Sequence, residues 1–268
     1  MIDLSISVVL YKNEPEQIQT LLNSIHSSQL NYKIFLVDNS PTDSLKNFGS
    51  KNNVEYIFTG KNLGYGAGHN IAIRETINTT KYHLVVNPDV KFDEDVLEKL
   101  FEFMNANDDV GQVIPKVLFP GGELQYVCKL IPTPFNLFSR LLPGNFFQKY
   151  NENFELRFSG YNKLMNIPYL SGCFMFLRCS ALKEIGLFDE RFFMYPEDID
   201  LTRRMHKKYK TIFYPYTHIY HEHTKSSFKS LHMFKIHMTN MLKYFNKWGW
   251  FFDEERKQVN KQTLNSIK

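Results

Sequence analysis

Cysteine is scarce in this chain, and its few positions form no pattern. The three cysteines among 268 residues are Cys128, Cys173 and Cys179, and they lack the close spacing of a metal-binding pair. Disulfide frameworks of secreted proteins use more cysteines, commonly in even number. We therefore exclude a disulfide-stapled scaffold and a cysteine-based metal site, and we expect a reduced, cytoplasmic protein.

Strong charge of one sign and long apolar runs are also lacking. The formal net charge is only +4, which suits an anionic small substrate or an anionic membrane surface but is too small to predict a nucleic-acid partner. The apolar run Leu4–Leu10 is too short for a signal peptide or a membrane span, and it has no basic lead. We expect the protein to stay on the cytoplasmic side.

There is no internal repeat either; short apolar runs alternate with helical patterns in the first half. Strands are expected at Ile6–Leu10, Lys33–Val37, Val54–Phe58 and His83–Val86. Helices are expected from Glu14, over His69–Asn78 and over Asp93–Met104. This alternation predicts an α/β fold with a mostly parallel central sheet flanked by helices.

The second half is less regular. Phe119–Tyr161 contains several prolines and glycines and is interpreted as a long loop with short helices over the mouth of a site. A strand at Tyr169–Leu177, a short helix at Ser180–Ile185 and helices at Glu197–Tyr209 and Ser226–Trp248 should follow. The first half therefore predicts the sheet, and the second half predicts a mixture of loops and helices beside it.

The last helix carries an apolar stripe among lysines. Its members recur at helical spacing and end in an aromatic cluster: Phe234, Met238, Met241, Leu242, Phe245 and Trp248, then Trp250, Phe251 and Phe252. Such a composition suits an amphipathic helix on a membrane surface. Packing of the same stripe on the rest of the protein is the alternative.

Polar or glycine-bearing segments follow four of the predicted strands. They are Tyr11–Asn13, Asp38–Ser40, Asn62–Gly64 and Asn87–Asp89. Because ligands bind beyond the carboxyl ends of strands in open α/β sheets, these segments predict a ligand-binding rim. The Asp38 carboxylate could accept hydrogen bonds from a nucleobase or ribose, or it could only stabilise a turn.

A glycine-rich run and an aspartate on this rim suit a phosphorylated ligand. Glycines at 64, 66 and 68 precede a helix, where the backbone can approach an anion closely. Their spacing matches neither the dinucleotide fingerprint nor a Walker motif, so a flexible connection is the alternative. Asp89 could bind Mg²⁺ or Mn²⁺ through oxygen, or it could belong to a plain turn.

Acids cluster within the aromatic segment Asp189–Asp200. Glu197 and Asp198 fall in the first turn of a predicted helix, where the dipole favours carboxylates. The apolar lead before them indicates a partly desolvated carboxylate suited to general-base catalysis, although stabilisation of the helix end is the simpler explanation. His221 and His223 alternate in an extended segment, and one imidazole could share a metal with Asp89.

Two sequence blocks carry a resemblance to a known protein family. Ser171–Arg178 and Gly186–Arg204 resemble the G-x-F-x-x-x-R and G-x-F-D-E-x-F-F-M-Y-x-E-D-x-D-L-x-x-R blocks of glycosyltransferase family 2, which has the GT-A fold. The resemblance covers about Ile6 to Ser227. Within the family, the N-P-D and F-F-M-Y-x-E-D variants resemble bacterial rhamnosyltransferases of O-antigen and cell-wall assembly.

The resemblance implies a role for each candidate residue. Asp198 would be the base that deprotonates the acceptor hydroxyl, and Asp89 and His221 would hold Mg²⁺ or Mn²⁺. Arg204 would support the helix or the diphosphate, and Ser226 would match the serine that commonly follows the histidine. The donor would be contacted by Tyr11 and Asp38 at the nucleoside and by Asn62, Gly64, Asn70 and Asp89 at the sugar and diphosphate.

The sequence departs from the family pattern at two places. Asn87 replaces the first acid of the D-x-D motif, and the Q-x-x-R-W motif of processive synthases is absent. Repeated addition with extrusion is therefore not expected, and His223 receives no role. The resemblance implies domains at 1–225, with a nucleotide-sugar half at 1–118 and an acceptor half at 119–225, and a helical extension at 226–268.

The implied reaction is inverting transfer of L-rhamnose from dTDP-L-rhamnose to a lipid-linked saccharide, at the cytoplasmic membrane surface. A UDP-hexose donor is the first alternative. A sugar nucleotidyltransferase is a second, but it would carry a basic glycine-rich loop after the first strand, where Leu10–Asn13 stands instead. A non-catalytic glycan-binding protein is a third. The oligomeric state is left open.

Overall fold

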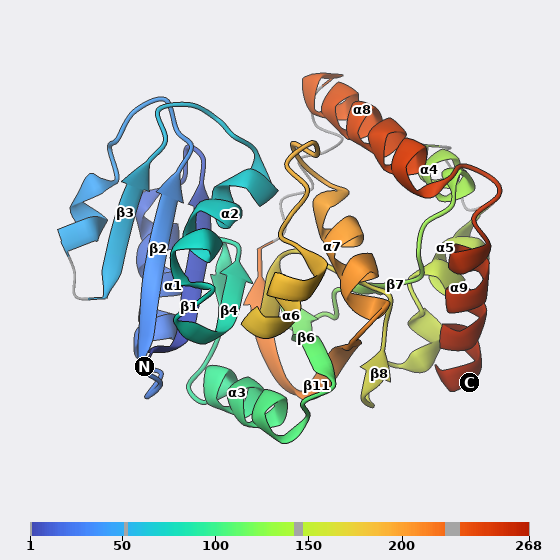
Figure 1. Cartoon of the computed structure of the whole chain (residues 1–268), viewed down its shortest axis with the longest axis horizontal. Helices are drawn as coiled ribbons and strands as arrows, with labels where there is room; N and C mark the ends of the chain where they lie inside the picture. Colours follow the sequence, from blue (N-terminus) through green and yellow to red (C-terminus); the bar gives the residue numbers. More distant parts are fainter. Residues whose placement is uncertain (1, 51–52, 142–146, 223–230, 268) are drawn as a thin grey trace.

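The computed structural model describes residues 2–50, 53–141, 147–222 and 231–267. In this part of the chain the centre is a nine-stranded sheet of order β3-β2-β1-β4-β10-β6-β11-β5, with β8 paired to β11 (Figure 1). Its strands are β1 (Ile2–Leu10), β2 (Tyr32–Asp38), β3 (Val54–Phe58), β4 (Thr80–Val86), β5 (Val90–Lys91), β6 (Val110–Leu118), β8 (Met165–Asn166), β10 (Phe174–Arg178) and β11 (Lys210–His221).

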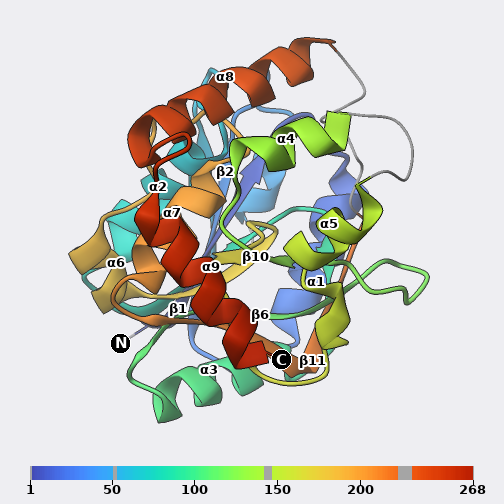
Figure 2. The ribbon, with the colours of Figure 1, turned by 90° about the vertical axis from the view of Figure 1, so that its right-hand side faces the viewer.

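Helices lie on both faces of this sheet (Figures 1 and 2). The helices of the described residues are α1 (Pro15–His26), α2 (Tyr65–Thr76), α3 (Val96–Ala106), α4 (Pro134–Leu141), α5 (Gln148–Phe154), α6 (Cys179–Ile185), α7 (Glu197–His206), α8 (Leu231–Trp248) and α9 (Glu254–Ile267). A small second sheet pairs β7 (Cys128–Lys129) with β9 (Tyr169–Leu170). The predicted α/β fold with a helix-flanked central sheet is confirmed.

The first half of the chain forms the parallel part of the sheet. β1 pairs in parallel with β2 and β4, and β2 pairs in parallel with β3. Strands covered on both faces bury nearly every residue, which is why they appear in the sequence as continuous apolar runs. The four predicted strands of this half fall inside the observed ones, and α2 begins at Tyr65, one turn before the predicted start.

The second half departs from the parallel pattern. β10 runs antiparallel to both β4 and β6, whereas β11 runs parallel to β6. The predicted strand at Tyr169–Leu177 is in fact two strands, because β9 leaves the main sheet to pair with β7. The intervening turn at Ser171–Cys173 brings backbone groups to the edge where the predicted rim lies.

β6 was not predicted. Gly111 and Pro115 interrupt its apolar run and make it look irregular in the sequence. In the structure, the missing side chain of Gly111 leaves room for Met205 of α7 and for Tyr209, which follows that helix. Pro115 pairs with Tyr214 next to a bulge of β11, where a strand tolerates the loss of one ladder hydrogen bond.

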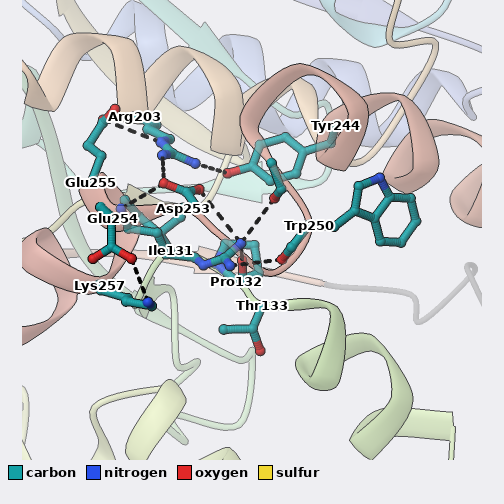
Figure 3. A network of polar contacts seen from close by, with 12 residues as sticks. Ile131, Pro132, Thr133, Arg203, Tyr244, Trp250, Asp253, Glu254, Glu255 and Lys257 are labelled. Atoms are coloured by element: carbon teal, nitrogen blue, oxygen red, sulfur yellow. Dashed lines mark hydrogen bonds and ion pairs between the residues drawn. The ribbon is translucent and has the colours of Figure 1, made fainter.

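The C-terminal helix α9 falls inside the predicted helical extension at 226–268, although its own bounds were not predicted. Its anchor is a buried ion pair in which Arg203 of α7 donates to Asp253 at 2.8 Å (Figure 3). Tyr244 of α8 and Glu255 of α9 also contact the Arg203 guanidinium. Because this helix is polar and short of apolar periodicity, its position depends on contacts that the local sequence does not reveal.

The apolar stripe of α8 corrects the membrane expectation in part. Met241 and Phe245 are buried against Phe192 and Ile199 of the protein itself, and of the predicted stripe only Leu242 is largely exposed. In the aromatic cluster predicted at the end of the stripe, Phe251 and Phe252 are 71% and 92% exposed between α8 and α9. No helix of the described residues is both long and apolar enough to cross a membrane.

Candidate active site

The predicted rim exists as one edge of the parallel strands. β1 and β2 end in register, with Leu10 opposite Asp38, and β4 ends beside them at Val86. The chain leaves β1 at Tyr11, whose side chain is 47% exposed, and the Lys12 N–H donates to the Ser40 hydroxyl at 2.8 Å. Tyr11 and Asp38 therefore belong to neighbouring loops of the same edge.

Asp38 is buried and fixed at both carboxylate oxygens. Its Oδ1 accepts the Ser40 N–H at 2.8 Å, and its Oδ2 accepts the Tyr56 hydroxyl at 2.6 Å. Burial, together with this hydrogen bond to Asp38, raises the pKa of Tyr56. The turn contact that the sequence allowed is present, and its geometry also holds the carboxylate rigidly at the rim.

The glycine-rich turn packs against the segment before α7. Gly64 has φ of +89°, and a Cβ there would collide with the Phe193 carbonyl, which accepts the Tyr65 N–H at 3.0 Å. The Asn62 side chain accepts the Gly64 N–H at 3.0 Å. A glycine is required at position 64 both for its backbone conformation and for this close approach.

Asn70 is not brought to the rim. Its side chain is fully buried, donates to the Phe188 carbonyl at 2.9 Å and to Glu190 at 2.8 Å, and accepts the Phe188 N–H. Arg204 is engaged in a similar way. It donates to the carbonyls of Ile185, Gly186 and Leu187 and pairs with Asp200 at 2.9 Å. Of the two roles predicted for Arg204, these contacts match support of the helix.

Asp89 and His221 come together from distant parts of the sequence. His221 Nε2 lies 3.4 Å from Asp89 Oδ1 and 3.3 Å from the Asn87 amide. On its other side, His221 Nδ1 lies 3.0 Å from Gln125 Oε1, and Gln125 Nε2 donates to the His221 carbonyl at 2.6 Å. Gln125 thus hydrogen-bonds to both the ring and the backbone of this histidine, and this contact was not predicted from the sequence.

This arrangement selects a tautomer. An amide oxygen can only accept, so Gln125 Oε1 requires a proton on His221 Nδ1. In a neutral imidazole, Nε2 then carries the lone pair, which accepts from the Asn87 amide at 3.3 Å and lies beside Asp89, as in metal-binding histidines oriented by a second partner. The donor set of one carboxylate and one such imidazole fits a divalent cation. No group of three or more acidic, histidine or cysteine ligands occurs in the described ranges, so substrate or water would complete the coordination.

Glu197 and Asp198 differ in their surroundings although they are adjacent at the start of α7. Glu197 is 4% exposed, and its Oε2 has no hydrogen-bond partner among the described residues. Asp198 is partly exposed; its Oδ2 accepts the Gly172 N–H at 2.9 Å and its Oδ1 the Ile199 N–H at 2.7 Å. Burial raises the pKa of both carboxyls, and the Asp198 charge raises that of Glu197 further. Asp198 is the acid that a ligand can reach.

Gly172 lets Asp198 lie close against the backbone. A Cβ at this position would lie 3.1 Å from the Asp198 Cβ, tighter than an ordinary contact. The Gly172 carbonyl accepts the Tyr65 hydroxyl at 2.7 Å, and the same hydroxyl lies 2.9 Å from Asn87 Oδ1. Tyr65 was not predicted, although it lies inside the glycine-rich run that was. His223 and Ser226 lie outside the described residues, as does the 225/226 domain boundary.

The sequence model of glycosyl transferase family 2 matches residues 6–186, which is more than half of the chain. The match ends before α7, and therefore before Asp198 and His221.

Curated relatives are similar at modest identity. The low-salt glycan biosynthesis hexosyltransferase Agl10 of Haloferax volcanii is 28% identical over 77% of this chain, which spans 62% of that protein. The N-acetylglucosaminyl-diphospho-decaprenol L-rhamnosyltransferase of Mycobacterium tuberculosis is 24% identical over 84% of this chain and 77% of its own length. The rhamnosyltransferase WbbL of Escherichia coli is 25% identical over 88% of this chain and 90% of its own length.

Solved structures share the fold. The crystal structure of residues 1–349 of S. aureus TarS covers 98% of this chain and 71% of that one, with a TM-score of 0.59 and 16% identity. That of GalNAc-T7 with UDP, GalNAc and Mn²⁺ covers 82% of this chain and 44% of that one, with a TM-score of 0.61 and 12% identity. The predicted GT-A fold is confirmed by this likeness.

Proposed function

Because the chain belongs to glycosyltransferase family 2, we propose that it is an inverting glycosyltransferase in which Asp198 is the general base. One observation carries the proposal. A partly exposed Asp198 lies against Gly172, the Tyr65 hydroxyl donates to both the Gly172 carbonyl and Asn87 Oδ1, and the Asn87 amide contacts His221 beside Asp89. A proton acceptor and a set of groups suited to a diphosphate are thus neighbours at one edge of the sheet.

The chemistry proposed is a single displacement. An acceptor hydroxyl attacks the anomeric carbon of the donor from the face opposite the nucleotide. Its proton passes to a carboxylate oxygen of Asp198, the new glycosidic bond forms, and the bond to the diphosphate oxygen breaks with the electron pair. Because attack and departure occur on opposite faces, the configuration inverts. A positioned base of this kind contributes about 10²–10⁴-fold in rate.

We propose that Asp89 and His221 hold a divalent cation, Mg²⁺ or Mn²⁺. Such an ion neutralises the charge that builds on a departing diphosphate. Support comes from the Gln125 contact, which leaves the His221 Nε2 lone pair on the side of Asp89. Two protein ligands alone bind weakly, so the cation should depend on the donor for its affinity. Full turnover in excess chelator would contradict this part of the proposal.

We propose dTDP-L-rhamnose as the donor and a lipid-linked saccharide as the acceptor, in bacterial polysaccharide assembly. The named activities of two relatives support the rhamnosyl donor. A hexosyltransferase among the relatives keeps a UDP-hexose as the alternative. Calorimetric titration with dTDP-rhamnose, UDP-glucose, UDP-galactose and GDP-mannose tests the choice. Tighter binding of a UDP- or GDP-sugar would exclude dTDP-L-rhamnose as the donor, while the proposal of glycosyl transfer would stand.

A lipid-linked acceptor requires contact with the cytoplasmic membrane surface, which we propose for the turn between α8 and α9. Its support is the exposure of Phe251 and Phe252, since the stripe of α8 is largely used within the protein. Flotation with anionic liposomes tests this contact. Replacing both phenylalanines by serine should reduce the bound fraction, whereas Phe158→Ser, at another exposed phenylalanine, should not. Equal flotation of all three proteins would exclude the turn.

The reaction itself is tested by incubating purified protein with each donor and an acceptor glycolipid and following release of the nucleoside diphosphate. Acceptor-dependent release that is lost in Asp198→Asn is the expected result. Release of pyrophosphate from a nucleoside triphosphate and a sugar phosphate would instead indicate a nucleotidyltransferase. Binding of glycan without any turnover would indicate a non-catalytic binding protein.

A further inference from the structure

The Tyr65 hydroxyl occupies a central position among the acids of the site. It lies at the start of α2, 2.7 Å from the Gly172 carbonyl and 2.9 Å from Asn87 Oδ1. Burial raises the pKa of this phenol well above its ordinary value, and the nearby acids Glu197, Asp198 and Asp89 act in the same direction. The hydroxyl therefore keeps its proton and remains a hydrogen-bond donor at any working pH.

One acceptor of this hydroxyl belongs to the base side. The Gly172 carbonyl is part of the turn whose N–H donates to Asp198 Oδ2. A Cβ at this glycine would lie 3.1 Å from the Asp198 Cβ and 3.3 Å from Oδ2, so the turn packs closely against the carboxylate side chain. The next carbonyl, that of Cys173, accepts the Asn87 N–H at 3.0 Å, so the turn is fastened to the end of β4 as well.

The other acceptor belongs to the side proposed to receive the diphosphate. The Asn87 amide that meets Tyr65 also contacts His221 Nε2 at 3.3 Å, and His221 lies beside Asp89. Tyr65 is thus the side chain whose single hydroxyl touches the supports of both halves of the reaction. Its own backbone is held by the Phe193 carbonyl, in the segment that leads into Asp198.

We propose that Tyr65 is a positioning residue for glycosyl transfer, whose hydroxyl sets the spacing between Asp198 and the Asn87–Asp89–His221 group. This inference rests on the proposed function of the same site. Catalysis by displacement needs base and leaving group aligned on opposite sides of one carbon, and a misplacement of about 1 Å costs about 10²-fold in rate. A shared hydrogen bond between the two supports keeps that alignment.

Tyr65→Phe tests the proposal because it removes one oxygen and keeps the ring. We expect kcat to fall about tenfold or more and the donor Kd to rise about threefold or more in the same variant. Hydrogen exchange measured by mass spectrometry should accelerate at least about tenfold in the peptide that contains Gly172 and Cys173, since a pinned turn is released. This exchange readout needs neither donor nor turnover.

Tyr82→Phe is the matched control. The Tyr82 hydroxyl bonds to Asn105 at 2.9 Å in the core on the α3 side, so its loss also removes a phenol hydrogen bond. Its kcat, donor Kd and exchange near Gly172 should equal those of the wild type. Unchanged exchange and kcat in Tyr65→Phe, with active wild type, would overturn the role of Tyr65 alone. Faster exchange in Tyr65→Phe with a wild type that transfers no sugar would reject the proposed function and keep the structural link.

Discussion

The two sides of the proposed site are supported over very different distances along the chain. On the nucleotide side, Asp38 is fixed by Ser40 and Tyr56, both within the parallel half of the sheet. On the base side, α7 is fixed by Arg203, whose partners are Asp253 and Glu255 of the C-terminal segment. The family match covers the first support and ends before the second. The support of Asp38 therefore lies within the matched part of the chain, whereas the proposed base is supported by the C-terminal segment.

The C-terminal helices also hold the segment that precedes the base. Asn240 of α8 donates to the Met194 carbonyl at 3.2 Å, and Lys247 pairs with Asp200 at 2.5 Å. Asp200 in turn holds Arg204. Since the same segment meets the glycine-rich turn through Phe193, the extension supports both the base and the loop opposite it.

The largest effect is expected when the long-range support of α7 is broken. Arg203→Ala leaves Asp253, which is 5% exposed, as a buried carboxylate without its main partner. Removal of one member of a buried pair costs about 3–5 kcal/mol. Urea unfolding should show this loss, and transfer should fall with it. Lys33→Ala breaks the exposed pair with Glu55 in the parallel half and should cost about 1 kcal/mol or less. Equal losses would contradict the asymmetry between the two supports.

A second prediction concerns the pH dependence of transfer. Burial raises the pKa of Asp198, and a general base acts only when it is deprotonated. The kcat should therefore fall about tenfold per unit as pH decreases below that pKa, with its midpoint above about pH 5 rather than near 4, the ordinary value for aspartate. Stopped assays across pH 4.5 to 8 with saturating donor measure it. A rate that is flat down to about pH 4 would argue against this base.

The smallest effect separates the two neighbouring acids. Because the folded pKa of Glu197 is raised, its contribution to stability is complete below the unfolded pKa of about 4.3 and is lost as pH rises through the folded value. Glu197→Gln stays neutral and avoids that loss. At pH 8 it should be more stable by at least about 1 kcal/mol, or at least ~2–4 °C in melting temperature, with the gain vanishing near pH 4. A gain that is equal at both pH values would show that ionisation of Glu197 is not its cause.

The contrast between the two halves also explains how far the sequence predicts the structure. The strands that end at Leu10, Asp38 and Val86 were predicted because apolar runs bounded by polar turns are a local signal. β6 was missed because Gly111 and Pro115 break such a run. Gly111 makes room for a residue of α7, and Pro115 is tolerated beside a bulge of β11, and neither contact can be seen in the local sequence. The bounds of the polar helix α9 within the predicted helical extension could not be predicted, because a distant arginine, rather than its own pattern, holds it in place.

The residues of the candidate site were likewise predicted only in part. Asp89, His221 and Asp198 were selected by motif resemblance, and the structure brings the first two together and links them to the third. Tyr65 and Gln125 could not be selected from the sequence. The role of a tyrosine hydroxyl or a glutamine amide depends on its hydrogen-bond partners, which here lie far away along the chain. The roles of all five residues remain predictions for experiment.

The most direct measurement of the central claim compares donor affinity and kcat in Asp198→Asn and Asp89→Asn. Asp198→Asn keeps the shape of the side chain and removes the basic oxygen. It should leave the donor Kd within about twofold and lower kcat by about 10² or more. Asp89→Asn should instead weaken donor binding in the presence of Mn²⁺. If Asp198→Asn retains near-normal kcat, or loses donor binding as Asp89→Asn does, Asp198 is not the base.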